Sequence, residues 1–141
     1  MFVKVTNGTP QYYTLGQLRR DNPQTSFPRS VSESLLAQYG IYPVTLTPAP
    51  TVNPLTEFST EAIEQVDGVW CQVWSVAQLP PETASHHVRD HRNNLISETD
   101  WMALSDSTLT EDWALYRQAL RDITSQAGFP YDVEWPAKPG E

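Results

Sequence analysis

The last third of the chain contains the segment that decides its fold, residues 92–139, RNNLISETDWMALSDSTLTEDWALYRQALRDITSQAGFPYDVEWPAKP. Thr110 occupies a helix N-cap position, where its hydroxyl could accept an unpaired backbone N–H, and two acidic residues follow it. Gly128 could supply the left-handed residue that ends the helix, and Pro130 would prevent a restart. Between these signals, large apolar residues recur every three or four positions and therefore share one helical face: Trp113, Tyr116, Leu120 and Ile123.

A second helix is predicted before this one, and an extended tail after it. Pro81 suits the first helical position, and residues up to about Ile96 continue a helical pattern with an apolar stripe of Ala84, Val88, His91 and Leu95. A connecting loop of roughly a dozen residues favours an antiparallel helical hairpin. Two prolines and alternating apolar residues favour an extended tail over residues 129–136, which we expect to pack along the hairpin.

The N-terminal half has the pattern of a β-rich module. Short alternating segments surround two strong two-residue hairpin signals, Asn7-Gly8 and Asp67-Gly68. Short helices are expected at residues 15–20 and, with Ser30 or Ser32 as the cap, up to about Tyr39. Residues 45–54, TLTPAPTVNP, contain three prolines and no charge, which predicts a stiff, extended connector.

The strand predicted after Asp67-Gly68 is apolar on both faces. Residues 69–76 read VWCQVWSV, so neither face has the polar character of a solvated surface. Such a strand is expected to be covered on both sides, and in so small a protein another chain could supply one cover. The expected fold class is α+β, with a β-rich module at residues 1–78 and a helical-hairpin domain with an extended tail at residues 79–141.

Composition excludes several classes of protein. The net charge is −8, which argues against binding the phosphate backbone of nucleic acid and favours a partner with a basic patch. No apolar run is long enough to span a membrane, and the N-terminus MFVKVTNGTP lacks the apolar core of a signal peptide. The single cysteine, Cys71, lies in an apolar run and is expected to be a reduced, buried thiol.

The candidates for chemistry are weak, and we expect neither a catalytic site nor a cofactor. His87 and His91 are four residues apart on a predicted helix, which is a possible spacing for two metal ligands, but no third ligand is indicated. A polar helix surface with one half-buried histidine is the simpler reading. Asp100 and Asp106 near Trp101 could resemble a sugar-cleaving pair, but a turn cap beside a packed tryptophan is favoured.

Large aromatic residues are the most informative feature for binding. Five tryptophans and six tyrosines are many for this length, and a core of two small subdomains accounts for only part of them. Arg117 and Arg121 could contact a partner, but ties to Asp100, Asp122 or Glu134 within the chain are favoured. The residues predicted to bind a partner are Trp70, Trp74, Trp101, Tyr116, Arg117 and Trp135.

The order and spacing of short motifs over about residues 85–139 resemble the tail assembly chaperone and tail-fibre assembly proteins of tailed bacteriophages. The motifs are Arg92, Leu95, Asp100-Trp101, Tyr116-Arg117, Leu120-Arg121-Asp122 and Trp135-Pro136-x-Lys-Pro. The resemblance implies a non-enzymatic phage protein that is made in the host cytoplasm and located in the virion tail. Its partners would be the tail fibre or a baseplate protein, within a multimeric assembly.

The resemblance leaves open whether the chain remains in the virion or leaves as a chaperone. The additional N-terminal module favours a protein that stays attached. Two other functions remain as alternatives: a module that binds glycans on the host surface, and a small metal-dependent enzyme using His87 and His91.

Overall fold

The structure, a computed structural model, describes residues 1–141 and has an α+β fold with a five-stranded sheet and four α-helices. The chain separates into two compact units, which are described in turn: the first comprises Met1–Pro50 and Ser59–Ser75, and the second Thr51–Phe58 and Val76–Glu141. The expected division into modules at residues 1–78 and 79–141 stays a prediction about independent folding. No helix of the structure has the length and apolar character needed to cross a membrane.

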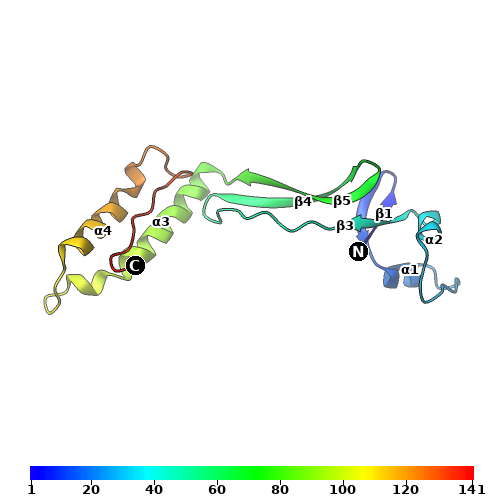
Figure 1. Cartoon of the computed structure of the whole chain (residues 1–141), viewed down its shortest axis with the longest axis horizontal. Coiled ribbons are helices and arrows are strands. Elements are labelled where there is room, and N and C mark those ends of the chain that lie inside the picture. The colour runs from blue at the N-terminus through cyan, green and yellow to red at the C-terminus, as the bar shows by residue number, and fades with distance from the viewer. The chain divides into compact units, whose positions relative to one another are not determined.

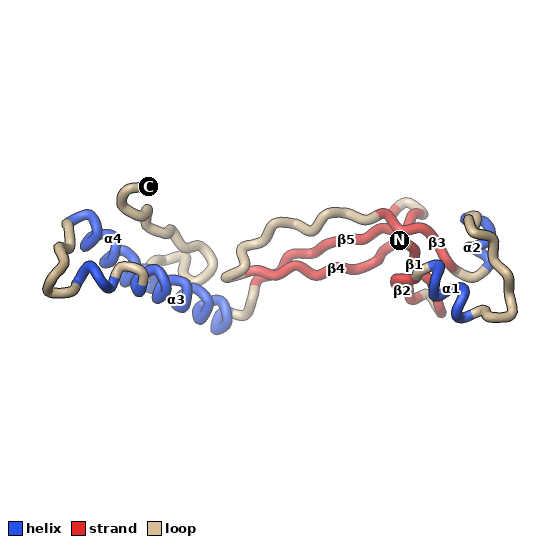
Figure 2. The backbone as a smooth tube through the Cα atoms, turned by 90° about the horizontal axis from the view of Figure 1, so that it is seen from below, coloured by secondary structure: helices blue, strands red, loops and turns tan.

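The sheet has the strand order β2-β1-β3-β5-β4 (Figure 2). β1 is antiparallel to both β2 and β3, whereas β3 and β5 are parallel, with Val44 opposite Trp70. The two terminal positions in this order are held by β2 and β4, so these are the edge strands. The strand bounds are Phe2–Thr6 (β1), Thr9–Tyr13 (β2), Ile41–Thr45 (β3), Glu57–Val66 (β4) and Val69–Gln78 (β5).

Both predicted hairpins are confirmed. Asn7 and Gly8 connect β1 to β2, and Asp67 and Gly68 connect β4 to β5. All four residues have positive φ, between 49° and 82°, as a two-residue turn between twisted antiparallel strands requires. Asparagine, aspartate and glycine tolerate this conformation better than other residues, which is why the sequence signal was reliable.

Two short helices close the core of the first unit. α1 (Leu15–Asp21) begins with a capping box between Thr14 and Gln17, and α2 (Glu33–Gln38) begins at Ser32, whose hydroxyl accepts from the Leu35 N–H. Gly40 then turns the chain at a φ of +71°. The buried core consists of Tyr13, Leu18, Leu36 and Ile41.

The proline-rich connector, predicted for residues 45–54, contains no helix and no strand at residues 46–54, whereas Thr45 is the last residue of β3. Within the first unit it is held by side chains. Thr47 donates its backbone N–H to Gln72 Oε1 at 3.1 Å and its hydroxyl to the Gln72 carbonyl at 2.8 Å. The Trp74 indole donates to the Thr47 carbonyl at 3.0 Å. The start of the connector therefore lies against β5.

Within this chain β5 is not covered on both faces, and the expectation that another chain could supply one cover stays a prediction. Residues 70–74 are half-buried, and residues 75–78 are exposed. Val69 and Val76 are about half exposed, and Cys71 is half-buried instead of fully buried. The physical reason is that β4 is paired with β5 alone and that no helix lies over the later part of β5 as it does over β1 and β3.

Two α-helices and two short 3-10 helices form the second unit. They are α3 (Pro81–Ser97), η1 (Asp100–Ala103), α4 (Glu111–Arg121) and η2 (Asp122–Ser125). Pro81 does begin α3, as its restricted φ favours. α4 does begin after Thr110, but the Thr110 side chain makes no capping hydrogen bond, so that part of the prediction is wrong.

Gly128 does not end α4. The helix ends at Arg121 and passes into η2, and Gly128 has no positive φ. Instead, the chain turns tightly around a cis Phe129-Pro130 bond, and the Asp132 N–H donates to the Gly128 carbonyl at 2.8 Å. A Cβ at residue 128 would overlap the Asp132 carbonyl oxygen. Glycine is therefore required for a close backbone approach and not for a left-handed conformation.

The core of the second unit lies where α3, α4 and the C-terminal segment meet. Val88 of α3 is buried with the predicted apolar face of α4, and Trp113 packs beside it. Figure 1 shows the C-terminal segment running beside α3. Partly buried residues from that segment, Phe129, Val133 and Trp135, complete the cluster around Val88, Tyr116, Leu120 and Ile123.

Candidate functional site

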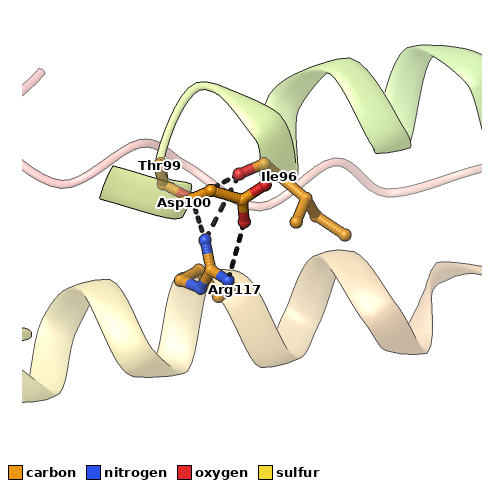
Figure 3. A network of polar contacts seen from close by, with 4 residues as sticks. All are labelled: Ile96, Thr99, Asp100 and Arg117. Atoms are coloured by element: carbon orange, nitrogen blue, oxygen red, sulfur yellow. Dashed lines mark hydrogen bonds and ion pairs between the residues drawn. The ribbon is translucent and has the colours of Figure 1, made fainter. Parts of the chain in front are cut away.

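Arg117 ties α4 to the end of α3. Its Nη1 donates to the Ile96 carbonyl at 3.2 Å and to the Thr99 hydroxyl at 2.6 Å, and its Nη2 contacts Asp100 Oδ1 at 3.1 Å (Figure 3). The Arg117 side chain is only 8% exposed, whereas that of Asp100 is 60% exposed. The guanidinium thus satisfies a carbonyl at the C-terminal end of α3 and joins three consecutive structural elements. Arg117 therefore holds α4 against the end of α3. The sequence analysis favoured such contacts within the chain for Arg117.

The C-terminal segment is fixed along α3 at three places. The Tyr131 hydroxyl donates to the Leu79 carbonyl at 2.6 Å, just before the helix begins. Trp135 packs edge-on against His91 at 4.7 Å between ring centroids, and Lys138 lies 3.7 Å from Glu98 at the helix end. The segment therefore follows the direction of α3.

A glutamine that the sequence did not single out also holds this segment. The Gln126 amide donates to the Glu134 carbonyl and accepts from the Glu134 N–H, both at 2.8 Å. These two hydrogen bonds satisfy the backbone groups of Glu134, as the backbone of a neighbouring strand would in a sheet. No periodic or compositional signal marks Gln126, because its partner is a backbone group.

The six predicted partner-binding residues do not form one surface. Trp70 and Trp74 are half-buried in the first unit, and the other four belong to the second unit. Tyr116 and Arg117 are buried, and Trp135 is half-buried against His91. Only Trp101 is well exposed, at 58%. Partner binding by these residues stays a prediction, and as placed here only Trp101 offers most of its side chain to another protein.

The second unit also exposes leucines that sequence reasoning missed. Leu115 is 62% exposed on α4, and Leu104 and Leu109 are exposed in the loop that leads to it. Beside Leu115 lies a groove of about 450 Å³, which we call the α4 groove; it is lined by Asp112, Leu115, Tyr116, Ala119 and residues 136–141. Leu115 lies outside the helical face that contains Trp113 and Tyr116. A leucine outside the buried face of a helix could have been predicted to be exposed.

Apolar side chains are also exposed on the hairpin of β4 and β5, residues 57–78, which we call the ribbon; its turn and most of its length belong to the first unit. Val66 and Val69 are about half exposed on either side of its turn. A pocket of about 470 Å³ adjoins the turn and is lined by Val5, Gly40, Tyr42, Pro43, Gln65, Gly68, Val69 and Trp70. Exposed apolar patches of this kind are typical of protein interaction sites.

The histidines do not assemble with other ligands. His86 lies 3.2 Å from Asp90, and His91 packs against Trp135. Nowhere in the structure do three or more His, Cys, Asp or Glu side chains form a group that could hold a metal ion. Asp100, the candidate for a sugar-cleaving pair, is bonded to Arg117.

Three tyrosines have raised pKa values. Burial, followed by the hydrogen bond from the hydroxyl to Asp21, raises the pKa of Tyr13 to about 12. Burial also raises the pKa of Tyr116, and the charge of Glu98 acts in the same direction. Burial raises the pKa of Tyr12, assisted by the charge of Glu61. All three shifts keep the phenol protonated to a higher pH than in a free tyrosine.

Comparison with known proteins finds a family match within the second unit. Residues 85–140 match the family model described as phage tail assembly chaperone protein. This match confirms the family that the sequence resemblance indicated, over almost the same residues. No curated protein and no solved structure matches the chain.

Proposed function

We propose that this chain is a non-enzymatic bacteriophage tail protein that binds the tail fibre or its baseplate attachment. The match of residues 85–140 to the phage tail assembly chaperone family supports a role in tail assembly and carries the proposal. In this proposal α3 and α4 act as an antiparallel helical hairpin with an extended tail, and the β-rich module of residues 1–78 supplies a second docking surface.

The buried polar contacts of the second unit support a binding role over a catalytic one. Arg117, Gln126 and Tyr131 use their polar groups to hold the unit together, and each is already bonded within the chain. Between residues 98 and 115 the exposed large apolar side chains are Trp101, Leu104, Leu109 and Leu115. An exposed tryptophan can contribute the buried hot spot of a protein interface.

The charge of the same region suits a basic surface on the partner. Between residues 98 and 115 the chain has five acidic residues and no lysine or arginine, the acids being Glu98, Asp100, Asp106, Glu111 and Asp112. An acidic rim around an apolar centre favours association with a partner of opposite charge. A chain with two such surfaces fits a component that remains in the virion tail after it has been made in the host cytoplasm.

Affinity capture from phage-infected cells tests this proposal. The tagged full chain should retain tail-fibre or baseplate proteins, identified by mass spectrometry. Leu115→Glu should reduce their recovery by about tenfold or more, since it places a charge in an apolar contact. The matched control is Ala114→Glu, which adds the same charge at an exposed neighbouring position of α4.

Two results would contradict the proposal. Equal recovery of tail proteins with Leu115→Glu and Ala114→Glu would mean that this part of α4 does not lie in the interface. Capture of no tail protein, together with binding of bacterial surface glycans by the purified chain, would favour the glycan-binding alternative.

A further inference from the structure

β4 is an edge strand of unusual length for so small a sheet. It covers the ten residues Glu57–Val66 and is the last strand in the order β2-β1-β3-β5-β4. One side of β4 pairs with β5, and the other side pairs with no strand. A row of unpaired backbone N–H and C=O groups along such an edge can accept a further strand.

The register of the ribbon identifies those backbone groups. The Thr60 and Ser75 hydroxyls lie 2.8 Å apart, and the Leu79 N–H donates to the Thr56 carbonyl at 2.8 Å. Together with the two-residue turn at Asp67-Gly68, these contacts direct the even-numbered backbone groups of β4 toward β5. The N–H groups directed away from β5 are therefore those of Ser59, Glu61, Ile63 and Gln65.

β4 lacks several of the devices that keep an edge from pairing. It contains no lysine and no proline, and the structure gives no left-handed residue within it; its charged residues are all acidic. Phe58 and Val66 are 40% and 45% exposed on one face of the strand, at its two ends. The edge therefore offers both backbone groups and apolar side chains to an incoming strand.

Charge indicates which strand this edge accepts. No lysine or arginine occurs between Arg29 and Arg89, whereas β4 and its turn carry Glu57, Glu61, Glu64 and Asp67. A second copy of the chain would bring the same four acidic residues to both sides of the new pairing with no base to offset them. Like charges across adjacent strands are destabilising, so the edge disfavours a second copy and favours a basic strand.

We propose that the free edge of β4 binds an extended segment of a partner protein in which apolar residues alternate with lysine or arginine. Its apolar side chains would face the side of Phe58 and Val66, and its basic side chains would face the side of Glu57 and Glu61. The segment becomes a sixth strand of the sheet. This inference names the partner chemistry for the second docking surface and in that respect rests on the proposed function.

Amide hydrogen exchange measured by NMR on the full chain tests the inference residue by residue. The probe is a synthetic peptide of about ten residues in which valine alternates with lysine, and the control peptide has glutamate in place of lysine. The valine-lysine peptide should slow exchange at Ser59, Glu61, Ile63 and Gln65 by about tenfold or more. Thr60, Ala62 and Glu64 already face β5 and should change little, so the protection should alternate along the strand.

Charge reversal on β4 provides a matched pair of variants. Glu61 is exposed and lies on the same face as Glu57, where the basic side chains of the partner would lie; its carboxylate accepts a hydrogen bond from Gln72 Nε2. Glu61→Lys should weaken binding of the lysine peptide and strengthen binding of the glutamate peptide. Glu61→Gln removes the charge without reversing it, keeps an acceptor oxygen for Gln72, and should have an intermediate effect on both.

Three results would overturn the inference. Absence of protection at the four edge amides with the lysine peptide would mean that the edge accepts no strand. Equal protection by the two peptides would mean that charge does not select the partner. Protection of the same amides without any peptide, rising with protein concentration, would assign the edge to a second copy. Because the assay uses no phage component, these results are independent of whether tail proteins are captured from infected cells.

Discussion

The core of the second unit and the ribbon of β4 and β5 are both rich in large apolar side chains, but only the core is buried by other parts of the chain. In the second unit, Val88, Leu120 and Ile123 are at most 1% exposed. In the ribbon, Val66, Val69 and Val76 are each 45–50% exposed. The difference shows that the apolar content of a segment does not by itself predict whether the rest of the chain buries that segment.

The two regions differ because a helix and a strand need different amounts of cover. The apolar face of α4 occupies one side of the helix, and α3 with the C-terminal segment is enough to bury it. β5 is apolar on both faces and needs a layer on each side. The connector and the rest of the first unit supply only part of those layers, so the remainder is available to another protein.

The largest expected effect comes from truncating the closed core. Leu120→Ala removes a fully buried side chain and should lower the free energy of unfolding by about 2–5 kcal/mol. Leu115→Ala on the same helix and Val69→Ala on the ribbon remove exposed side chains and should each cost less than about 1 kcal/mol. Urea unfolding of the three variants would measure these losses of unfolding free energy. A similar loss for all three would contradict the difference between the buried core and the exposed positions.

Substitution of Gly128 should also be costly. Gly128→Val forces a Cβ and two methyl groups against the Asp132 carbonyl, so we expect a loss of about 1–3 kcal/mol in unfolding free energy. The control is Gly16→Ala in α1, where a Cβ would find its nearest contact at 3.5 Å. That change should be neutral or slightly stabilising, because alanine favours a helix. Thermal unfolding that gave the same result for both variants would contradict the close approach at residue 128.

Removal of the Arg117 contacts should have a smaller effect. Arg117→Met keeps most of the packing but removes the donor to the buried Thr99 hydroxyl, whereas the Ile96 carbonyl still accepts from the Thr99 hydroxyl and N–H, so we expect a cost of about 1–2 kcal/mol. Asp100 is well exposed, so its lost ion pair should add little. Arg117→Lys retains the charge but not the forked geometry and should recover only part of the loss in chemical denaturation. Full recovery of the unfolding free energy in Arg117→Lys would show that the charge of residue 117, and not its forked geometry, stabilises the unit.

The smallest effect is a pH dependence in the first unit. Because the pKa of Tyr13 is about 12 in the folded protein and near 10 when unfolded, the folded state holds its proton more tightly. This contribution to stability is present below pH 10 and is lost as the pH rises from about 10 through 12. Tyr13→Phe should therefore make the melting temperature fall less steeply over that interval. Parallel curves for the two proteins would contradict the shift.

The sequence predicted those elements whose signals are local. Asn7-Gly8 and Asp67-Gly68 required positive φ, Pro81 began α3, and the spacing of Trp113, Tyr116, Leu120 and Ile123 identified a buried helical face. These features depend on one residue type at one backbone position, or on the period of a single helix. They can therefore be read without knowledge of the rest of the chain.

The failures concern contacts between distant residues. Gly128 was read as a helix end because glycine commonly serves there, whereas its role depends on how Asp132 returns to it. Tyr116 and Arg117 are buried against α3 and its C-terminal end, and their contact with a partner stays a prediction. Gln126 was missed because it recognises backbone groups. Exposure along β4 and β5 also could not be predicted, because it depends on what the rest of the fold leaves uncovered.

We propose that other proteins of a phage tail cover the surfaces left open in both units. Quantitative mass spectrometry of purified virions and of infected-cell lysate, using phage that encodes this chain, can show whether they do. We expect the chain to be present in virions at a fixed ratio to the fibre or baseplate protein. Its absence from virions, with recovery on free fibre in the lysate, would make it a chaperone that departs. Its absence from both would contradict the account.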